Sequence, residues 1–385
     1  MRPLLTCPHC GNENRSLARY CRGCSKRIPA QTPDISKSIR DLIAPQRLGE
    51  VRGKNPGTLT YGGFLWLISE QGELYQASGG AKQLFPCAKF PEGGFSFPLT
   101  IEIDDKNGPI IYANNHRGVF KYNVLAEKVD KLFEVADSNS RIVSGLIKRG
   151  LDFYYLTQES RAHSAVRLTL SSSDKKFSYP LAAVTLHGSL SSPLQRIGDD
   201  LWVITREKLL VFQNFSAAKP REFSWNPWRI WVTSKGILYS EKANTGVGGD
   251  TQSIWRLTFG EAGFEHYSLA EGLSLTARVA TSEDGKAVIF TPSGIKVFDA
   301  ALNSMAELTG IVQVHNPQAI QLSPPFIFWF ETADRSIRAW TIGASRIFSL
   351  WSFTASVNFS QFLLTGSSLY GFTEEEVWRW GLLDT

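Results

Sequence analysis

The sequence predicts an all-β fold built from short strands. Its 385 residues include 24 Phe, 11 Tyr and 11 Trp, together with 32 Gly, 18 Pro and only two Met. Aromatic side chains favour strands, whereas glycine and proline favour tight turns. The 43% apolar and 20% charged content is that of an ordinary globular chain.

A repeat of about 43 residues runs through the chain from Pro56 onward. Each copy holds an apolar strand, a short turn and a second strand, as in Phe64–Ile68 followed by Gly72–Tyr75. A further apolar segment precedes the hairpins, and another follows most of them. Four short strands per repeat correspond to one blade of a β-propeller. The hairpins are expected to begin with strands at 64–68, 110–114, 153–157, 201–205, 236–240, 287–291, 326–330 and 369–373.

We therefore expect an eight-bladed β-propeller over residues 46–385. A seven-bladed ring is the alternative, because the fourth and fifth copies leave only Arg229–Val232 for an inner strand before Gly236. The last copy ends at 380–383 without a fourth strand, and residues 46–52 precede the first copy's inner strand. An exchange of strands between the termini would then close the ring.

The hairpin signature, a glycine followed by aliphatic and aromatic residues, resembles that of quinoprotein-type and other bacterial repeat propellers. Ser282–Phe290 is similar to the S-x-D-G-K turn of TolB-type blades. The Gly-His and Trp-Asp dipeptides of WD-type repeats are missing from this sequence. The resemblance implies a propeller and leaves open which propeller family it is.

Four of the five cysteines form two C-x-x-C pairs, Cys7/Cys10 and Cys21/Cys24, separated by ten residues. Two such turns can aim four thiolates at one point, which is the tetrahedral set that zinc prefers. A set of four cysteines leaves no coordination position for water, so the zinc is expected to be structural. Disulfides are the alternative, but no secretory signal is visible at the N-terminus, which favours a reducing compartment.

This segment also resembles the short zinc-ribbon modules found at the N-termini of many bacterial and archaeal proteins. Asn14, Tyr20 and Ile28 fill the other positions of that pattern, whereas Ser25 stands where the family usually has glycine. The resemblance implies one structural Zn²⁺ bound by Cys7, Cys10, Cys21 and Cys24.

Three regions are expected: a zinc ribbon over 1–28, a linker with a short amphipathic helix over 29–45, and the propeller over 46–385. Residues 1–54 hold 11 basic and four acidic side chains, a net charge of +7, whereas the remaining chain has a net charge of −2. The ribbon could therefore dock a protein or bind nucleic acid. Its candidate residues for nucleic acid are Arg15, Arg19, Arg22, Lys26 and Arg27.

Motifs for catalysis are weak. The chain has neither a glycine-rich phosphate loop with Lys-Ser/Thr nor a G-x-S-x-G nucleophile turn, and its six histidines are dispersed. No apolar run reaches the roughly 18 residues that a membrane span needs. We expect a cytoplasmic bacterial protein with a monomeric propeller.

The predicted function is a non-catalytic protein–protein interaction scaffold. In this interpretation the ribbon is a docking module, and the propeller face that carries the hairpin turns and blade connections binds the partner. Two alternatives stay open: nucleic-acid binding through the basic arm, and a propeller enzyme or small-ligand binder. The aromatic candidates could instead pack between blades. The candidate partner-binding residues are Phe95, Arg117, Trp225, Trp228 and Arg335.

Overall fold

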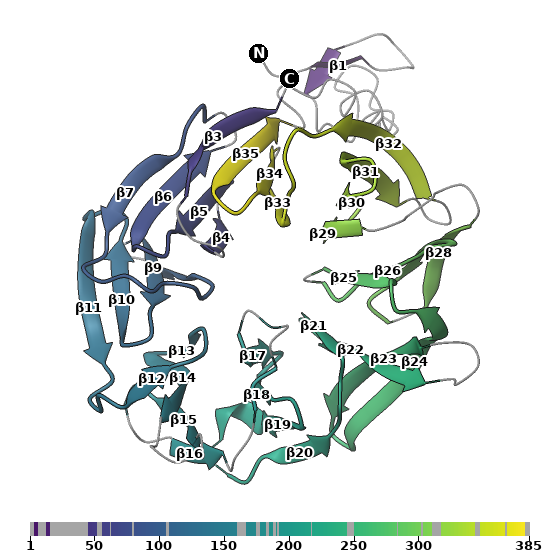
Figure 1. Ribbon diagram of the computed structural model, residues 1–385. Coiled ribbons are helices and arrows are strands. Elements are labelled where there is room, and N and C mark those ends of the chain that lie inside the picture. The colour runs from purple at the N-terminus through teal and green to yellow at the C-terminus, as the bar shows by residue number, and fades with distance from the viewer. Residues whose placement is uncertain are drawn as a thin grey trace.

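Eight antiparallel sheets stand around a central opening in the computed structural model (Figure 1). The structure describes residues 45–51, 56–61, 63–78, 81–104, 108–159, 167–174, 178–181, 185–187, 190, 192–216, 218–244, 250–282, 284–301, 303–309, 317–342, 347–365 and 368–381. It also describes the backbone of 4–6 and 13–15, which form β1 (Leu4–Thr6) and β2 (Glu13–Arg15). The expected linker helix lies outside the described residues.

In blades 1 to 7 the strands follow one another along the chain from the centre of the ring to its rim. Blade 1 consists of β4 (Gly57–Tyr61), β5 (Phe64–Ile68), β6 (Glu73–Ser78) and β7 (Phe85–Lys89), and blade 2 of β8 (Thr100–Asp104), β9 (Gly108–Asn114), β10 (Gly118–Asn123) and β11 (Lys128–Glu134). Blade 3 consists of β12 (Ser140–Ile142) with β13 (Ile147–Arg149), β14 (Asp152–Glu159), β15 (Arg167–Ser172) and β16 (Ser178–Leu181). Blade 4 consists of β17 (Leu194–Ile197), β18 (Asp200–Ile204), β19 (Lys208–Phe212) and β20 (Arg221–Ser224). A 3-10 turn, η1 (Gln213–Phe215), follows β19.

The second half of the ring repeats this order. Blade 5 consists of β21 (Arg229–Thr233), β22 (Gly236–Asn244), β23 (Asp250–Gly260) and β24 (Gly263–Ser274), and blade 6 of β25 (Arg278–Thr281), β26 (Ala287–Thr291), β27 (Gly294–Phe298) and β28 (Ser304–Thr309). Blade 7 consists of β29 (Pro317–Ser323), β30 (Phe326–Glu331), β31 (Ser336–Ile342) and β32 (Ile347–Thr354). Blade 8 consists of β33 (Gln361–Thr365), β34 (Ser368–Phe372), β35 (Glu376–Gly381) and β3 (Gln46–Glu50). The prediction of eight blades is confirmed, and the seven-bladed alternative is wrong because Arg229–Thr233 does form the inner strand of blade 5.

Blade 8 is completed by the N-terminal side of the chain. Strand β3 pairs antiparallel with β35, placing Gln46 opposite Arg379 and Glu50 opposite Glu376. Figure 1 shows β3 beside β35 where the ring begins and ends. The predicted exchange of strands between the termini therefore closes the ring and covers an edge that would otherwise be unpaired.

The core consists of apolar layers between neighbouring blades. Second strands such as β26 and β34 are buried at every position. Each such strand is covered on both faces by adjacent blades, so its residues are mostly apolar and do not alternate with polar ones. In the described part of the chain, no helix has the length and apolar character that crossing a membrane requires.

Candidate binding site on the loop face

The two faces of the ring differ in what emerges from them. One face carries the turns between the second and third strands of each blade and the connections from one blade to the next. Each first strand begins at this face, and each second strand ends at it. We call this the loop face. All five predicted partner-binding residues lie on it, but at separate places around the ring: Phe95 and Arg117 at blades 1 and 2, Trp225 and Trp228 between blades 4 and 5, and Arg335 at blade 7.

Two of the predicted aromatic contacts are buried. Phe95 is 1% exposed and packs against Phe90 and Phe120, with ring centroids 5.3 and 5.6 Å away. Trp225 is 8% exposed, and its indole nitrogen donates to the carbonyl oxygen of Thr205 at 3.1 Å. Both side chains therefore pack in the core between neighbouring blades, which is the alternative to a role in partner binding.

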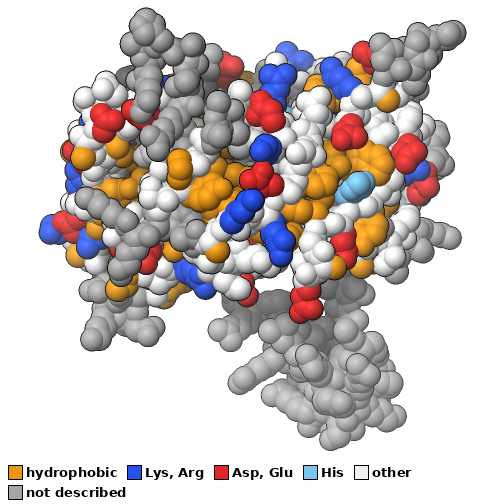
Figure 2. Space-filling model, turned by 90° about the horizontal axis from the view of Figure 1, so that it is seen from below, with side chains coloured by type: hydrophobic (Ala, Val, Ile, Leu, Met, Phe, Trp, Pro, Cys, Tyr) orange, Lys and Arg blue, Asp and Glu red, His pale blue; other side chains and the backbone are white. Residues whose placement is uncertain are grey.

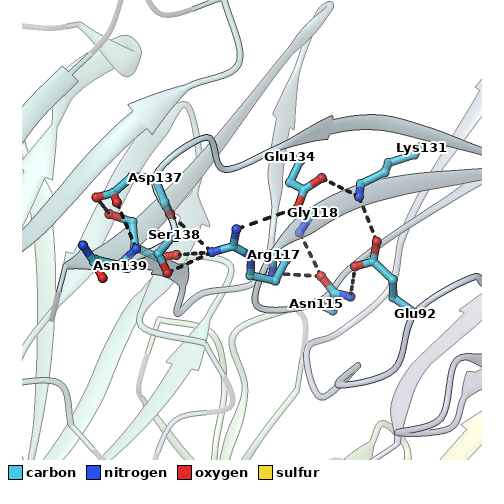
Figure 3. A network of polar contacts seen from close by, with 10 residues as sticks. Glu92, Asn115, Arg117, Gly118, Lys131, Glu134, Asp137, Ser138 and Asn139 are labelled. Carbon is cyan, nitrogen blue, oxygen red and sulfur yellow. Dashed lines mark hydrogen bonds and ion pairs between the residues drawn. The ribbon is translucent and has the colours of Figure 1, made fainter.

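Arg117 is occupied by contacts within blade 2 and its connection to blade 3 (Figure 3). Its Nη1 donates to the carbonyl oxygens of Asp137, Ser138 and Ser140 at 3.2 to 3.3 Å, and its Nη2 lies 3.8 Å from a carboxylate oxygen of Glu134. These bonds tie the turn between β9 and β10 to the connection that follows β11. Arg117 is therefore a positioning residue of the loop face.

A second part of this network links blade 1 to blade 2. Lys131 Nζ donates to Glu92 at 2.8 Å and to Glu134 at 2.7 Å, and Asn115 donates to Glu92 at 3.2 Å (Figure 3). The hydrogen bond from Lys131, followed by that from Asn115, holds the pKa of Glu92 below its usual value. Acidic and basic side chains thus balance each other on this side of the loop face.

Arg335 lies in the turn between β30 and β31. It is exposed and has a positive φ of 54°, and its guanidinium donates to the carbonyl oxygen of Ser356. Its own carbonyl accepts from the backbone nitrogen of Ala355 at 2.7 Å. The turn is therefore fastened to the connection toward blade 8, while the exposed guanidinium stays accessible.

Trp228 stands out because two cations contact one indole. The Arg229 guanidinium carbon lies 4.0 Å from the ring centroid, and Lys242 Nζ lies 4.3 Å from it. The register explains this convergence, since Arg229 pairs with Ser240 and Lys242 is two residues further along β22. Glu241 lies between Ser240 and Lys242 and so points to the other face of the strand. Burial of Tyr239, together with the charge of Glu241, raises the pKa of Tyr239 to about 12.

A second arginine from the next blade meets this cluster. The carbonyl oxygen of Ala277 accepts from Arg229 Nη1 and Arg278 Nη1, both at 3.3 Å, and from Gln252 Nε2 at 3.2 Å. Burial and the positive charge of Arg278 lower the pKa of Arg229. Among the described residues, neither guanidinium forms an ion pair with an acidic side chain. We call Trp228, Arg229, Lys242 and Arg278 the cationic cluster.

The two arginines line a cavity at the central channel. It has a volume of about 680 Å³ and is bounded by the inner strands of blades 5 to 8. Its polar lining includes Gln318, Gln321, Ser360 and Gln361. Amide and hydroxyl groups can both donate and accept hydrogen bonds, so the cavity can accommodate a polar ligand that also meets the two guanidiniums.

The rim offers a different kind of surface. In Figure 2, hydrophobic side chains gather in a band along the side of the ring seen in this view, bordered by acidic and basic residues. Partly buried rim aromatics such as Phe223 and Phe264 pack against the core between blades 4 and 5, with ring centroids 5.3 Å apart. At this seam the rim aromatics form the outer edge of the core between the two blades.

The predicted zinc ligands Cys7, Cys10, Cys21 and Cys24 lie outside the described residues, as do the side chains of Arg15, Arg19, Arg22, Lys26 and Arg27. The described backbone near them shows one feature: β1 and β2 pair antiparallel, with Thr6 opposite Glu13. The first C-x-x-C pair lies in the sequence between these two strands. Within the described residues, no group of three or more His, Cys, Asp or Glu side chains could hold a metal ion.

Comparisons with known proteins agree with the fold. Residues 4–29 match a family model described as a domain of unknown function (DUF7577). No curated protein sequence matches the chain significantly. BamB from Moraxella catarrhalis is similar in structure, with a TM-score of 0.53 and 9% identity over 88% of this chain and 98% of that one. The computationally designed Ika8 protein has a TM-score of 0.52 and 13% identity over 87% and 99% of the two chains. The fold thus defines the protein as an eight-bladed β-propeller, and identities this low show the fold alone.

Sequence reasoning missed Arg229, Lys242 and Arg278 as candidate site residues. One signal was present: among the eight first strands, all of them described, only β21 and β25 begin with a charged residue. Both residues are arginine, and the two blades are adjacent. Comparing the same position across repeats would have found the pair.

Proposed function

We propose that this protein is a non-catalytic interaction scaffold that binds a protein partner through the loop face at blades 5 and 6. The observation that carries the proposal is the contact of Trp228 with Arg229 and Lys242, at 4.0 and 4.3 Å from the ring centroid. Tryptophan and arginine are the residue types that contribute most to protein interfaces. The cluster consists of groups that bind, namely an indole and three cations, and not of a paired acid and base.

The ring supports this role by holding the cluster rigidly. The backbone nitrogen of Trp228 donates to the carbonyl oxygen of Ser240 at 2.7 Å, and His187 Nε2 lies 3.2 Å from the carbonyl oxygen of Pro227. The connection between blades 4 and 5 is thereby fastened on both sides. A recognition surface that is rigid before binding loses little conformational entropy when the partner arrives.

The N-terminal segment is proposed as a second docking module, folded around one structural Zn²⁺ held by Cys7, Cys10, Cys21 and Cys24. The C-x-x-C spacing supports this, as does the pairing of β1 with β2 around the first cysteine pair. So short a segment cannot bury enough apolar surface to fold alone, whereas zinc bound by four thiolates supplies roughly 10 to 16 kcal/mol of apparent binding free energy.

The test is recovery of the partner from cells by chemical crosslinking to the tagged, full-length protein. We expect Trp228→Ala combined with Lys242→Ala to reduce recovery at least about tenfold, which corresponds to roughly 1.4 kcal/mol. The melting temperature should change little, because Lys242 is exposed and Trp228 is only partly buried. Tyr267→Ala on the rim, where the side chain is 52% exposed, is the control and should keep full recovery. Undiminished recovery with the double variant would contradict the proposal.

Nucleic-acid binding is the second candidate function, favoured by the net charge of +7 within residues 1–54. Contacts of Lys and Arg to phosphates make such binding fall steeply with salt concentration. Fluorescence anisotropy with single- and double-stranded oligonucleotides at low salt tests it. Binding that disappears in the Arg15→Glu/Arg19→Glu/Arg22→Glu variant would favour this function over protein docking by the ribbon.

A further inference from the structure

We propose that Arg229 and Arg278 form a receptor for the carboxylate side chains of an acidic peptide segment that enters the channel mouth. This inference rests on the proposed function and names the chemistry of the partner. Both arginines line the cavity of about 680 Å³, and both are joined to the same carbonyl oxygen, that of Ala277.

The first argument is electrostatic. Two guanidiniums on adjacent inner strands are partly buried, and neither has an acidic partner within the described part of the chain. Lys242 brings a third positive charge to the same indole as Arg229. Like charges held together in a partly buried site are costly unless an anion joins them. A carboxylate bound between the arginines offsets the repulsion between the two guanidiniums. Its binding free energy is therefore more favourable than at an isolated surface arginine.

The second argument is preorganisation. Arg278 Nη1 donates to the carbonyl oxygens of Leu275, Thr276 and Ala277 at 3.0 to 3.3 Å, so its orientation is fixed by the backbone that precedes β25. Arg229 is fixed by Ala277 and by its contact with Trp228. A guanidinium has five N–H donors in a planar fork, so one held through Nη1 keeps other donors for a bidentate bond to a carboxylate.

Gln252 sets the position of the shared carbonyl. The Gln252 side chain is fully buried, and its Nε2 donates to the carbonyl oxygens of Ser274 at 2.8 Å and of Ala277 at 3.2 Å. Its Oε1 is buried without a hydrogen-bond partner among the described residues. Gln252 thus holds the segment between β24 and β25 on which both arginines depend, and it acts as a positioning residue.

The rest of the cavity favours a peptide. Gln318, Gln321 and Gln361 line it, and their amides can pair with the N–H and C=O groups of an extended backbone. A volume of this size suits a few residues of chain. Nucleic acid is less suitable, because a phosphate track needs a row of unpaired cations, whereas Lys131 and Arg117 elsewhere on the loop face are occupied by Glu92 and Glu134.

Fluorescence anisotropy with a fluorescein-labelled hexaglutamate peptide and the full-length protein tests the proposal at low salt. We expect saturable binding that weakens as salt increases. Arg229→Gln and Arg278→Gln should each weaken it about tenfold, and the double variant should abolish it. Arg196→Gln is the matched control, because Arg196 lies in inner strand β17 toward the other end of the channel and should leave binding within about twofold. Arg278→Lys, which keeps the charge but loses the planar fork, should retain part of the binding.

The proposal is overturned if hexaglutamate does not bind, or if the double variant binds it as well as the unmodified protein does. Competition by citrate at equal carboxylate concentration would instead identify a small-molecule site, and preferential binding of a single-stranded oligonucleotide would identify a phosphate site; either result also overturns it. Thermal melting of each variant separates lost binding from lost folding. Because no cellular partner is used, failure here is distinguishable from failure of the scaffold function, which the Trp228→Ala/Lys242→Ala recovery tests separately.

Discussion

Nη1 of Arg379 in β35 donates to the carbonyl oxygen of Ala81 at 2.9 Å, joining the last blade to the first across 298 positions of the sequence. Arg379 is only 4% exposed. In the same seam, the hydroxyl of Tyr370 donates to the carbonyl oxygen of Ser78 at 2.9 Å. The ring is therefore closed by side-chain bonds between blades 8 and 1 as well as by the pairing of β3 with β35.

Replacing Arg379 by Met should weaken this closure. The variant loses a charge-assisted hydrogen bond and leaves the Ala81 carbonyl without that donor, so we expect the free energy of unfolding to fall by about 2 kcal/mol. Urea denaturation followed by tryptophan fluorescence measures this change. Lys121→Met is the control at the corresponding third strand of blade 2, where the side chain pairs with Asp130 at the surface, and it should change the midpoint little.

Gly57 begins β4 at a point where the connection to blade 2 approaches closely. A Cβ atom there would lie 2.3 Å from the backbone oxygen of Phe97 and 2.9 Å from Ile68. We expect Gly57→Ala to destabilise the protein by about 1 to 3 kcal/mol, because backbone must move to make room. Gly260→Ala, where no atom lies within 4 Å, should leave the melting temperature close to that of the unmodified protein. Equal melting temperatures for the two variants would show that this seam tolerates a methyl group.

The Glu92 contacts predict a pH dependence of stability. The hydrogen bonds from Lys131 and Asn115 hold the pKa of Glu92 below its ordinary value of about 4.3. A carboxylate with a lowered pKa stabilises the fold above the unfolded value, and this contribution is lost as pH falls through the folded value. Glu92→Gln should therefore melt at a lower temperature than the unmodified protein at pH 7, with the difference vanishing toward pH 3. Thermal scans from pH 3 to 7 check this, with the exposed turn residue Glu261→Gln as the control.

The cysteine spacing predicts about one equivalent of zinc per chain. Elemental analysis of purified protein should find that metal, and Cys7→Ser or Cys21→Ser should release it. Because the propeller has its own core, its melting temperature should stay unchanged in both variants. Native protein without bound metal would contradict the two-module organisation.

The fold could be predicted from the sequence because each blade carries the same local signals. Second strands such as Phe326–Glu331 are apolar up to their last residue, and a short turn and a third strand follow. The extent of the strands was less predictable. The strand predicted at 236–240 is longer in the structure: β22 runs through Asn244 and pairs with β23, which begins at Asp250, so this hairpin is a longer ladder.

The site was harder to predict because it depends on contacts between blades. The sequence shows that Phe95 and Trp228 both lie in connections, but only the neighbouring blade determines that Phe95 is buried against Phe120 and that Trp228 meets Lys242. Likewise, Arg229 and Arg278 are about one repeat apart in the sequence, and the ring places both guanidiniums 3.3 Å from the carbonyl oxygen of Ala277.

Site-specific photocrosslinking in cells tests the central claim most directly, since it asks which face of the ring meets the partner. A photoreactive phenylalanine derivative replaces exposed Asn226, which lies beside the cationic cluster in the connection between β20 and β21 on the loop face. As the control it replaces Leu151, which is 93% exposed in the turn between β13 and β14 on the opposite face. The scaffold function predicts a discrete crosslinked protein at position 226 and none at position 151. Crosslinking at position 151 with none at position 226 would contradict it.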